Sequence, residues 1–450
     1  MPIRLSTQFR LLTVVLGAAL AAILLLTWGT GEAGASIKTF RAIHKAPRAI
    51  TFKPRGIDPQ RVRHASVRLK RRGRTVHHRI GIARVRRALR HKHRIRLRKG
   101  RHARRGKLVI SVAARPSPTP TPTCAPATFS ALSPPAACWR PYSSASPFNT
   151  PLSADPALAA GSAQMVDNWL STWSASNKTS APRFVAGYAD TANDYDHPLY
   201  FSGSSDPLYT VHCAEAWGRC PVEGAQVRIP AAAQPAAGED GHLAVIDQGS
   251  GWEYDFWQVR QKPAGGGTLT VSWGGKTKLD GAGTGSGATA GNFGLAAGII
   301  RPQELAAGKI DHALFMVVEC TNGTSVAPAG ADVGRTCSSM GLSNAGAPAM
   351  GQHFFLDMSA AEIEALSLPA WQKTVLRAMA EYGLYVGDTG GGFLKLESGS
   401  TYTSFGQPDP WIGVAKSAGI SPSRYNGKDS YTFDFSSAVD WRSRLRVAAG

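Results

Sequence analysis

The chain has 450 residues and a formal net charge of +21, a length that allows two or three domains. The distribution of this charge excludes a uniformly basic protein. Residues 38–115 hold 28 Lys and Arg and a single acidic residue, Asp58, whereas residues 116–450 hold 21 basic and 28 acidic residues. The chain therefore combines a strongly basic module with a large, mildly acidic domain.

The N-terminal residues have the pattern of an export signal. Arg4 and Arg10 precede an apolar run of 18 residues, Leu11–Trp28, and Ala33-Gly34-Ala35 supplies the small residues that a signal peptidase reads. We predict a signal peptide over residues 1–35, or a membrane anchor if it is not cleaved, since the run is just long enough to span a bilayer. The protein is expected to be secreted or displayed on the cell surface, and to touch the membrane only if the signal is uncleaved.

Residues 37–115 alternate apolar and basic side chains in several stretches, for example 62–69, 94–98 and 107–112. A period of two residues indicates strands with one buried face. This segment is therefore predicted to form a small basic β domain, immunoglobulin-like in its fold. The alternative is a solvated polybasic arm that becomes ordered only on a polyanion.

The partner expected for the basic segment is a polyanion: an anionic cell-wall polymer, an acidic polysaccharide, phospholipid headgroups or extracellular DNA. Intracellular nucleic acid is not expected, because the signal removes the protein from it. Phe40 and Phe52 are the only aromatic residues of the segment, which disfavours recognition of single strands by base stacking. The other alternative is a cationic spacer without a specific ligand.

A proline-rich linker follows over residues 116–123, where alternating prolines favour an extended conformation. The domain over residues 124–450 has short apolar runs separated by Gly and Pro turns, which is typical of a mainly β fold. We predict a β-sandwich or jelly-roll-like domain with one packed amphipathic helix. The helical signals are a capping box at residues 359–362 and an apolar stripe between Pro369 and Gly383.

All six cysteines lie after the linker, and an even number in an exported chain indicates disulfides. The short spacings favour three local loops, closed by the pairs Cys124–Cys138, Cys213–Cys220 and Cys320–Cys337. No pair has the C-x-x-C spacing of a zinc site, so neither a metal nor a cofactor is predicted.

Several segments of the large domain occur in a distinctive order: SPFN at 146–149, GHLAVID at 241–247, WEYDFW at 252–257, IDHAL at 310–314 and YGLYVGD at 382–388. The ordered set resembles an uncharacterised family of exported bacterial proteins of the actinobacterial type, over roughly residues 146–445. The resemblance implies export and an intact domain, and it transfers no catalytic residue.

A hairpin is predicted around the turn at residues 248–251, with Asp247 opposite Trp252. Since side chains alternate between the faces of a sheet, four residues then share one face: His242, Glu253, Asp255 and Trp257. Two carboxylates, an imidazole and an indole suit a sugar-binding groove or acid–base cleavage of a glycosidic bond. The alternative is an exposed strand face with a surface ion pair.

Three further residues complete the predicted site. His312 precedes an apolar strand, and Asp388 lies in an Asp-Thr-Gly turn from which it could reach the same cleft as a third carboxylate. Tyr382 is predicted, together with Trp257, to stack on sugar rings. The alternatives are a turn-capping histidine at position 312 and a glycine-rich turn without chemistry at position 388.

The sequence thus predicts an exported carbohydrate-active protein, a glycoside hydrolase or polysaccharide lyase acting on wall or environmental polysaccharide. In a hydrolase, Glu253 and Asp255 would act as the acid and the nucleophile or base. In a lyase, His242 or His312 would remove the proton α to a uronate carboxylate. The alternative is a non-catalytic glycan-binding or cell-envelope protein, since β-sandwiches serve both purposes.

Overall fold

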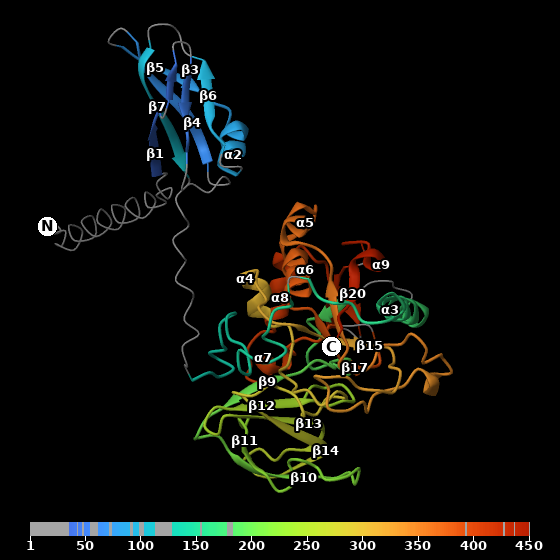
Figure 1. The fold of residues 1–450 in the computed structure, drawn as a ribbon. Coiled ribbons are helices and arrows are strands. Elements are labelled where there is room, and N and C mark those ends of the chain that lie inside the picture. Colours follow the sequence, from blue (N-terminus) through green and yellow to red (C-terminus); the bar gives the residue numbers. More distant parts are fainter. Residues whose placement is uncertain are drawn as a thin grey trace, which may run out of the picture. The chain divides into compact units, whose positions relative to one another are not determined.

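The computed structural model describes residues 36–42, 44–46, 49–54, 62–71, 74–90, 93–98, 103–112, 128–153, 155–177, 183–391, 394–425, 428–435 and 437–449. The predicted signal peptide or anchor, the linker and Cys124 lie outside these residues. The chain forms two compact units, residues 1–121 and 122–450 (Figure 1). No helix within the described ranges is long and apolar enough to cross a membrane.

The small unit contains two antiparallel sheets. One has the order β1-β7-β4-β5, formed by β1 (Ser36–Arg41), β7 (Ala103–Val112), β4 (Val62–Arg71) and β5 (Arg74–Arg79). The other has the order β2-β3-β6, formed by β2 (His44–Ala46), β3 (Ala49–Phe52) and β6 (Ile95–Arg98). The strands expected from the alternating pattern are present.

One core joins these two sheets to a helix that the sequence pattern does not predict, α2 (Ile82–Arg90). Val85 and Ala88 of α2 are buried against Val67 and Leu108 of the first sheet and Phe52 of the second. The helix escapes prediction because its apolar stripe is narrow and the rest of its surface is arginine-rich.

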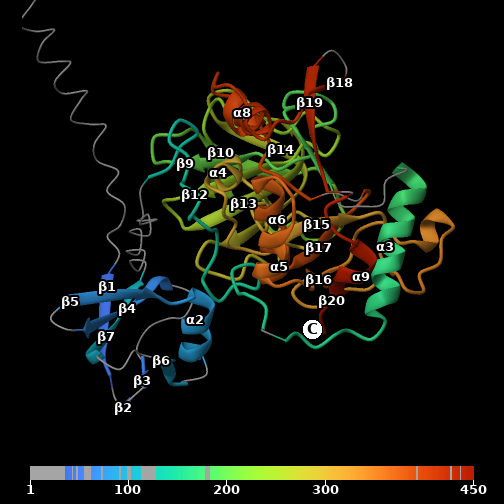
Figure 2. The ribbon, with the colours of Figure 1, turned by 90° about the horizontal axis from the view of Figure 1, so that it is seen from above.

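The large unit is built around a six-stranded sheet in the order β11-β10-β14-β13-β12-β9. Figure 2 labels five of these strands, β9, β10, β12, β13 and β14. Its strands are β9 (Leu199–Ser202), β10 (Leu208–Cys213), β11 (Gln226–Arg228), β12 (Leu243–Asp247), β13 (Trp252–Gln261) and β14 (Gly267–Lys278). The pairs β10/β14 and β12/β9 are parallel, and the others are antiparallel. The mainly β class is confirmed, while these parallel pairs differ from the antiparallel order of a plain sandwich.

Both faces of the six-stranded sheet are covered. One face carries a core that includes Val245, Phe256 and Val271. On the other face, Ala244 and Ile246 pack against residues 295–299 of the glycine-rich segment that follows β14. The run Leu-Ala-Val-Ile in β12 is therefore buried throughout, as expected for a strand enclosed on both sides.

A second sheet, in the order β15-β17-β16-β20, contains β15 (Leu314–Val318), β17 (Leu384–Thr389), β16 (His353–Leu356) and β20 (Leu445–Val447). Phe315 and Val317 of β15 pack against Phe293 and Ala297 of the glycine-rich segment. The opposite side of β15 packs with helices α3 (Ser162–Asn177), α6 (Ala370–Glu381) and α8 (Pro410–Ser417). The glycine-rich segment thus lies between the two sheets, with the helices beyond the second sheet (Figure 1).

A third sheet joins β18 (Ser423–Tyr425), β19 (Lys428–Asp434) and β8 (Arg183–Ala186). The other helices described in this unit are α4 (Pro302–Ala307), α5 (Ala360–Ala365), α7 (Ser400–Thr403), α9 (Trp441–Arg444) and the 3-10 turn η2 (Ser338–Met340). The predicted capping box is formed at α5, where Ser359 and Glu362 bond each other's backbone N–H. Gly383 follows α6 with a φ of 77°, as its predicted role as a helix stop requires.

Two of the predicted disulfides are formed, Cys213–Cys220 and Cys320–Cys337. Cys138 is also disulfide-bonded, and Cys124, its predicted partner, lies outside the described residues. The Cys213–Cys220 bridge closes a short loop that follows β10. One side chain of this loop belongs to the candidate site described below.

Candidate functional site

The predicted hairpin has the predicted register. Asp247 pairs with Trp252, Ile246 with Glu253 and Ala244 with Asp255. The side chains of Glu253 and Asp255 therefore share the face of Ala244 and Ile246, which the glycine-rich segment covers.

Glu253 and Asp255 are both completely buried, which corrects the expectation that they line a cleft and also the alternative of an exposed face. Glu253 accepts hydrogen bonds from Tyr142 Oη at 2.5 Å, Ala296 N at 2.8 Å and Thr277 Oγ1 at 3.2 Å. Its carboxylate thus ties the sheet to the segment lying over it. The predicted acid and nucleophile pair has no route to a polymer in this arrangement.

Asp255 lies beside Glu253 in the same enclosed interior. Burial, together with the neighbouring Glu253 carboxylate, raises the pKa of Asp255 well above its ordinary value. Burial beside a second carboxyl group therefore favours the protonated form of Asp255 more than exposure to water would.

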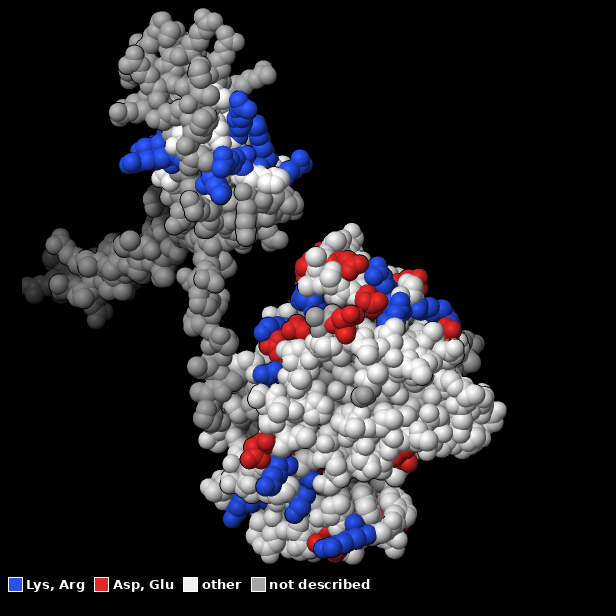
Figure 3. Space-filling view, in the orientation of Figure 1, with Lys and Arg blue, Asp and Glu red and all other residues white. Residues whose placement is uncertain are grey.

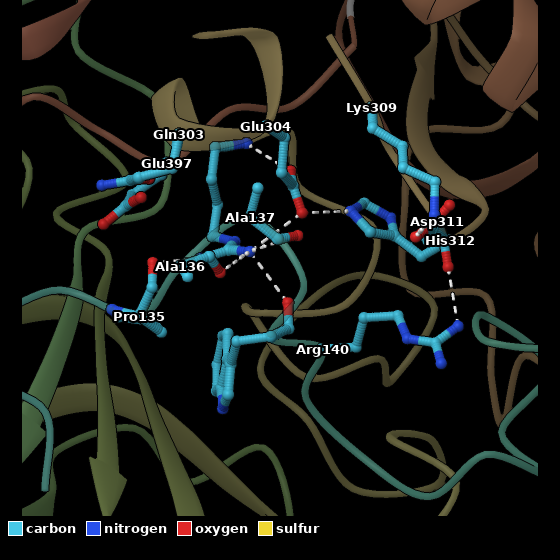
Figure 4. A network of polar contacts seen from close by, with 12 residues as sticks. Pro135, Ala136, Ala137, Arg140, Gln303, Glu304, Lys309, Asp311, His312 and Glu397 are labelled. Carbon is cyan, nitrogen blue, oxygen red and sulfur yellow. Dashed lines mark hydrogen bonds and ion pairs between the residues drawn. The ribbon is translucent and has the colours of Figure 1, made fainter. Parts of the chain in front are cut away.

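His312 lies in a different place, in a buried polar network beneath α4 (Figure 4). Its Nε2 is 3.1 Å from Glu304 Oε1, and Arg301 Nη2 is 3.0 Å from the same oxygen. Arg301 also donates to the backbone carbonyls of residues 135, 136, 137 and 139. His312 therefore does not converge with His242, and its surroundings are those of a structural network.

Tyr382 is also separated from the predicted site. Its side chain is buried in a cluster with Phe148 and Tyr385, and its backbone carbonyl lies 2.9 Å from His353 Nε2. A ring enclosed in this way has no free face for a sugar. Of the seven predicted site residues, three line one groove: His242, Trp257 and Asp388.

This groove has a volume of about 760 Å3. Its polar lining includes Asp240, Arg335 and Thr389, and its aromatic lining is three tryptophans. A large groove with aromatic walls and a few convergent polar groups is the usual form of a ligand site.

Three indoles form one end of the groove. Trp257 and Trp273 pair across β13 and β14, and the ring of Trp217 lies 5.5 Å from the first and 6.1 Å from the second, measured between centroids. Trp217 sits in the loop closed by the Cys213–Cys220 disulfide and is 61% exposed. The disulfide thus holds an indole in solvent beside two half-buried ones.

Acidic groups stand next to the indoles. Trp257 Nε1 donates to Asp240 Oδ1 at 3.1 Å. Burial raises the pKa of Asp388 to about 6, with Lys395 opposing the rise and Asp240 adding to it. Asp388 is therefore a carboxyl group that exchanges its proton near neutral pH, as a general acid or base must.

His242 lines the groove at the start of β12, although only 2% of its surface is exposed. Burial, together with Lys395, lowers the pKa of His242 to about 4. Its ring packs edge-on against His197 at 4.8 Å between centroids, and His197 Nδ1 lies 2.7 Å from the carbonyl oxygen of Leu295. Both imidazoles are consequently neutral at neutral pH.

A second cavity, of about 700 Å3, adjoins the first, and Asp240, Arg335 and Thr389 line both. Its other walls are more strongly charged and include Arg183, Tyr188, Asp196, Glu239 and Lys395. The two cavities are therefore neighbours, and we call them the aromatic arm and the charged arm of a two-armed groove.

Asp196 lies in the charged arm and is almost fully buried. Tyr188 Oη donates to its Oδ2 at 3.3 Å, and Leu396 N donates to its Oδ1 at 3.3 Å. Burial raises the pKa of Asp196 to about 8, against the opposing effect of Lys395. Asp196 therefore keeps its proton at neutral pH and can donate a hydrogen bond into the arm.

The raised pKa of Asp196 predicts a pH effect on stability. Between about pH 4 and pH 8 the folded protein holds a proton that the unfolded chain has lost, so the free energy of unfolding falls as the pH rises through this window. We expect Asp196→Asn to lose part of this dependence. The check is the difference in Tm between pH 5 and pH 8, which should be smaller in the variant than in wild type and unchanged in the exposed control Asp155→Asn.

The groove contains residues that the sequence reasoning missed, chiefly Trp217, Trp273, Asp240 and Lys395. A tryptophan between two bonded cysteines seven positions apart is a usable signal, because such loops lie on the surface and indoles usually do not. Asp240 and Lys395 occupy loop positions without any periodic pattern.

Among the residues that the structure describes, no group of three or more His, Cys, Asp or Glu side chains is placed to hold a metal ion. Comparison of the chain with known protein families, with curated proteins and with solved structures finds no match in any of the three. The resemblance to an exported bacterial family therefore stays a prediction.

Proposed function

We propose that the large unit binds a polysaccharide in the two-armed groove and hydrolyses its glycosidic bonds, with Asp388 as the general acid. The observation that carries this proposal is the presence of three indoles and a carboxyl group with a pKa of about 6 in a single groove. Sugars offer apolar faces to aromatic rings and hydroxyl groups to carboxylates, so this combination suits them.

The indoles of Trp217, Trp257 and Trp273 are the binding platform in this proposal. An exposed tryptophan leaves much apolar surface in water, and a disulfide that holds it there supports a binding role over a packing role. The rings are rigid, so they lose little conformational entropy when a ligand covers them.

Asp388 and Asp240 supply the two carboxyl groups that glycoside hydrolysis uses. Protonated Asp388 would donate its proton to the leaving oxygen. Asp240, held by the Trp257 indole, would act as the base or nucleophile on the other side of the bond. The neutral His242 adds no positive charge beside them.

The site of action that we propose is outside the cytoplasm, on wall or environmental polysaccharide. The export signal in the sequence and two disulfides support this, since disulfides form and persist in oxidising compartments.

We expect Trp217→Ala to weaken polysaccharide binding by about tenfold or more, because a tryptophan that anchors an interface often contributes about 1.4 kcal/mol or more. A panel of soluble polysaccharides in affinity electrophoresis would identify the ligand, and isothermal titration would measure the loss. The fold should be unaffected, since the indole is largely exposed.

Trp252→Ala is the matched control, because Trp252 is a tryptophan of the same sheet that lies outside the groove and contacts Lys276 and Lys278. It should bind as wild type does. Equal binding by wild type and Trp217→Ala, or failure of every polysaccharide to bind, would contradict the proposal. Binding without any release of reducing ends would reduce it to a non-catalytic glycan-binding protein.

A further inference from the structure

A row of basic residues lies on the small unit, on the outer face of the β1-β7-β4-β5 sheet. The register places four residues directly opposite one another on adjacent strands. Arg41 pairs with Lys107, Lys107 with Arg68, and Arg68 with His77. We call these four residues the basic row.

The basic row faces solvent. All four of its residues are exposed, while the alternate positions Val67, Leu69, Leu108 and Ile110 are buried in the core on the inner face. Directly paired residues project to the same side of a sheet, so the four side chains stand together. Figure 3 shows lysine and arginine, and neither aspartate nor glutamate, among the described residues of this unit on the visible face.

This arrangement costs stability unless an anion is present. Neighbouring strands are about 4.8 Å apart, so three fixed cations and a histidine fall within about 14 Å. Like charges directly opposite one another in a sheet repel. Within the described part of the small unit none of the four forms an ion pair, and the single acidic residue of the segment, Asp58, lies outside that part.

We propose that the basic row is a binding site for a linear acidic polysaccharide, which lies across the four strands and places successive anionic groups against successive cations. The charge complementarity of a straight row favours an extended chain of regularly spaced anions. Phe52, the aromatic residue of this unit whose side chain the structure describes, is buried, which disfavours base stacking on the described part of this face. The proposal concerns the small unit and does not depend on the groove.

The test uses the full chain and polygalacturonate as the probe, with dextran as its uncharged counterpart. We expect Arg68→Gln combined with Lys107→Gln to weaken polygalacturonate binding by about tenfold at 50 mM salt, because the central pair of the row is lost. Binding of polygalacturonate by wild type should also fall steeply at 500 mM salt, and any binding of dextran by the full chain should be the same in wild type and in the double variant.

The matched control is Arg87→Gln combined with Arg94→Gln, which removes the same charge from exposed positions on α2 and next to β6. The loss of polygalacturonate binding in this control, on a logarithmic scale of affinity, should be no more than about a third of the loss in the Arg68/Lys107 variant. The reason is that charges beyond the Debye length are screened. Equal losses in the two double variants would overturn the proposal, because net charge alone would then explain the binding. Arg68→Lys combined with Lys107→Arg should bind as wild type does.

Two further arms separate the row from other sites and ligands. Trp217→Ala should retain the salt-sensitive binding of polygalacturonate, because this binding does not use the groove. Loss of the salt-sensitive binding in Trp217→Ala would overturn the proposal. Duplex DNA at the same charge concentration should bind more weakly than polygalacturonate. Tighter binding of DNA that is abolished in the Arg68/Lys107 variant would assign the row to nucleic acid instead.

Discussion

Asp388→Asn is expected to reduce the rate of polysaccharide hydrolysis by about 10²- to 10⁴-fold, the usual contribution of a positioned general acid. The loss should appear in kcat, with KM nearly unchanged, because the indoles of the proposed binding platform are untouched. A single-turnover assay of reducing ends with wild type and variant measures it. Rate in the wild-type protein should fall above about pH 6, where Asp388 loses its proton.

The same substitution should not destabilise the protein. Burial disfavours the carboxylate of Asp388, so a neutral amide at this position removes an unfavourable charge. Thermal unfolding at pH 8 should give a Tm at or above that of wild type, which excludes misfolding as the cause of lost activity. Asp280→Asn, at an exposed position, is the control for rate. Full activity in Asp388→Asn would remove it from the mechanism.

Glu304→Gln is expected to lower the free energy of unfolding by about 3 to 5 kcal/mol, the cost of leaving one member of a buried ion pair uncompensated. Glu304 is fully buried between Arg301 and His312. Burial alone would raise the pKa of Glu304, but Arg301 and His312 together hold it below its ordinary value. The carboxylate is therefore the partner that makes the buried Arg301 tolerable, and urea unfolding followed by fluorescence measures its loss.

Glu364→Gln is the matched control, because Glu364 pairs with Arg377 at the surface, where such pairs contribute about 1 kcal/mol or less. At a temperature where the Glu304→Gln protein is folded, the polysaccharide binding of Glu304→Gln should equal that of wild type. That result would place His312 and its partners in a structural role. Weaker binding by the folded variant would instead bring this network into the site.

The hairpin, its register and the helix signals could be predicted because each depends on a local pattern. Alternation of side chains fixed which residues share a face, and that inference was right for Glu253 and Asp255. What covers that face is a question of tertiary structure. A glycine-rich segment approaches so closely that a Cβ at Gly294 would lie 2.2 Å from Tyr142 Oη. Two carboxylates that resemble a solvent-facing pair are therefore sealed inside.

The groove escaped prediction for a related reason. Its members come from separate loops and strand ends, such as Trp217 in a disulfide loop, Asp240 before β12 and Lys395 after β17. Loop positions carry no period, so a single sequence gives their residue types and not their convergence. Asp388 lies within β17, near its end, and not in the turn that the Asp-Thr-Gly sequence suggested, and from there it lines the groove.

The junction of the two cavities bears on where a polymer would be cut. Asp240 and Thr389 line both arms, and Asp388 is the neighbour of Thr389, so the carboxyl groups stand where the arms meet. A chain laid through both arms would have several sugar units on each side of the reacting bond. Cleavage would then be internal, and the viscosity of a long substrate should collapse while only a small fraction of its linkages has been broken.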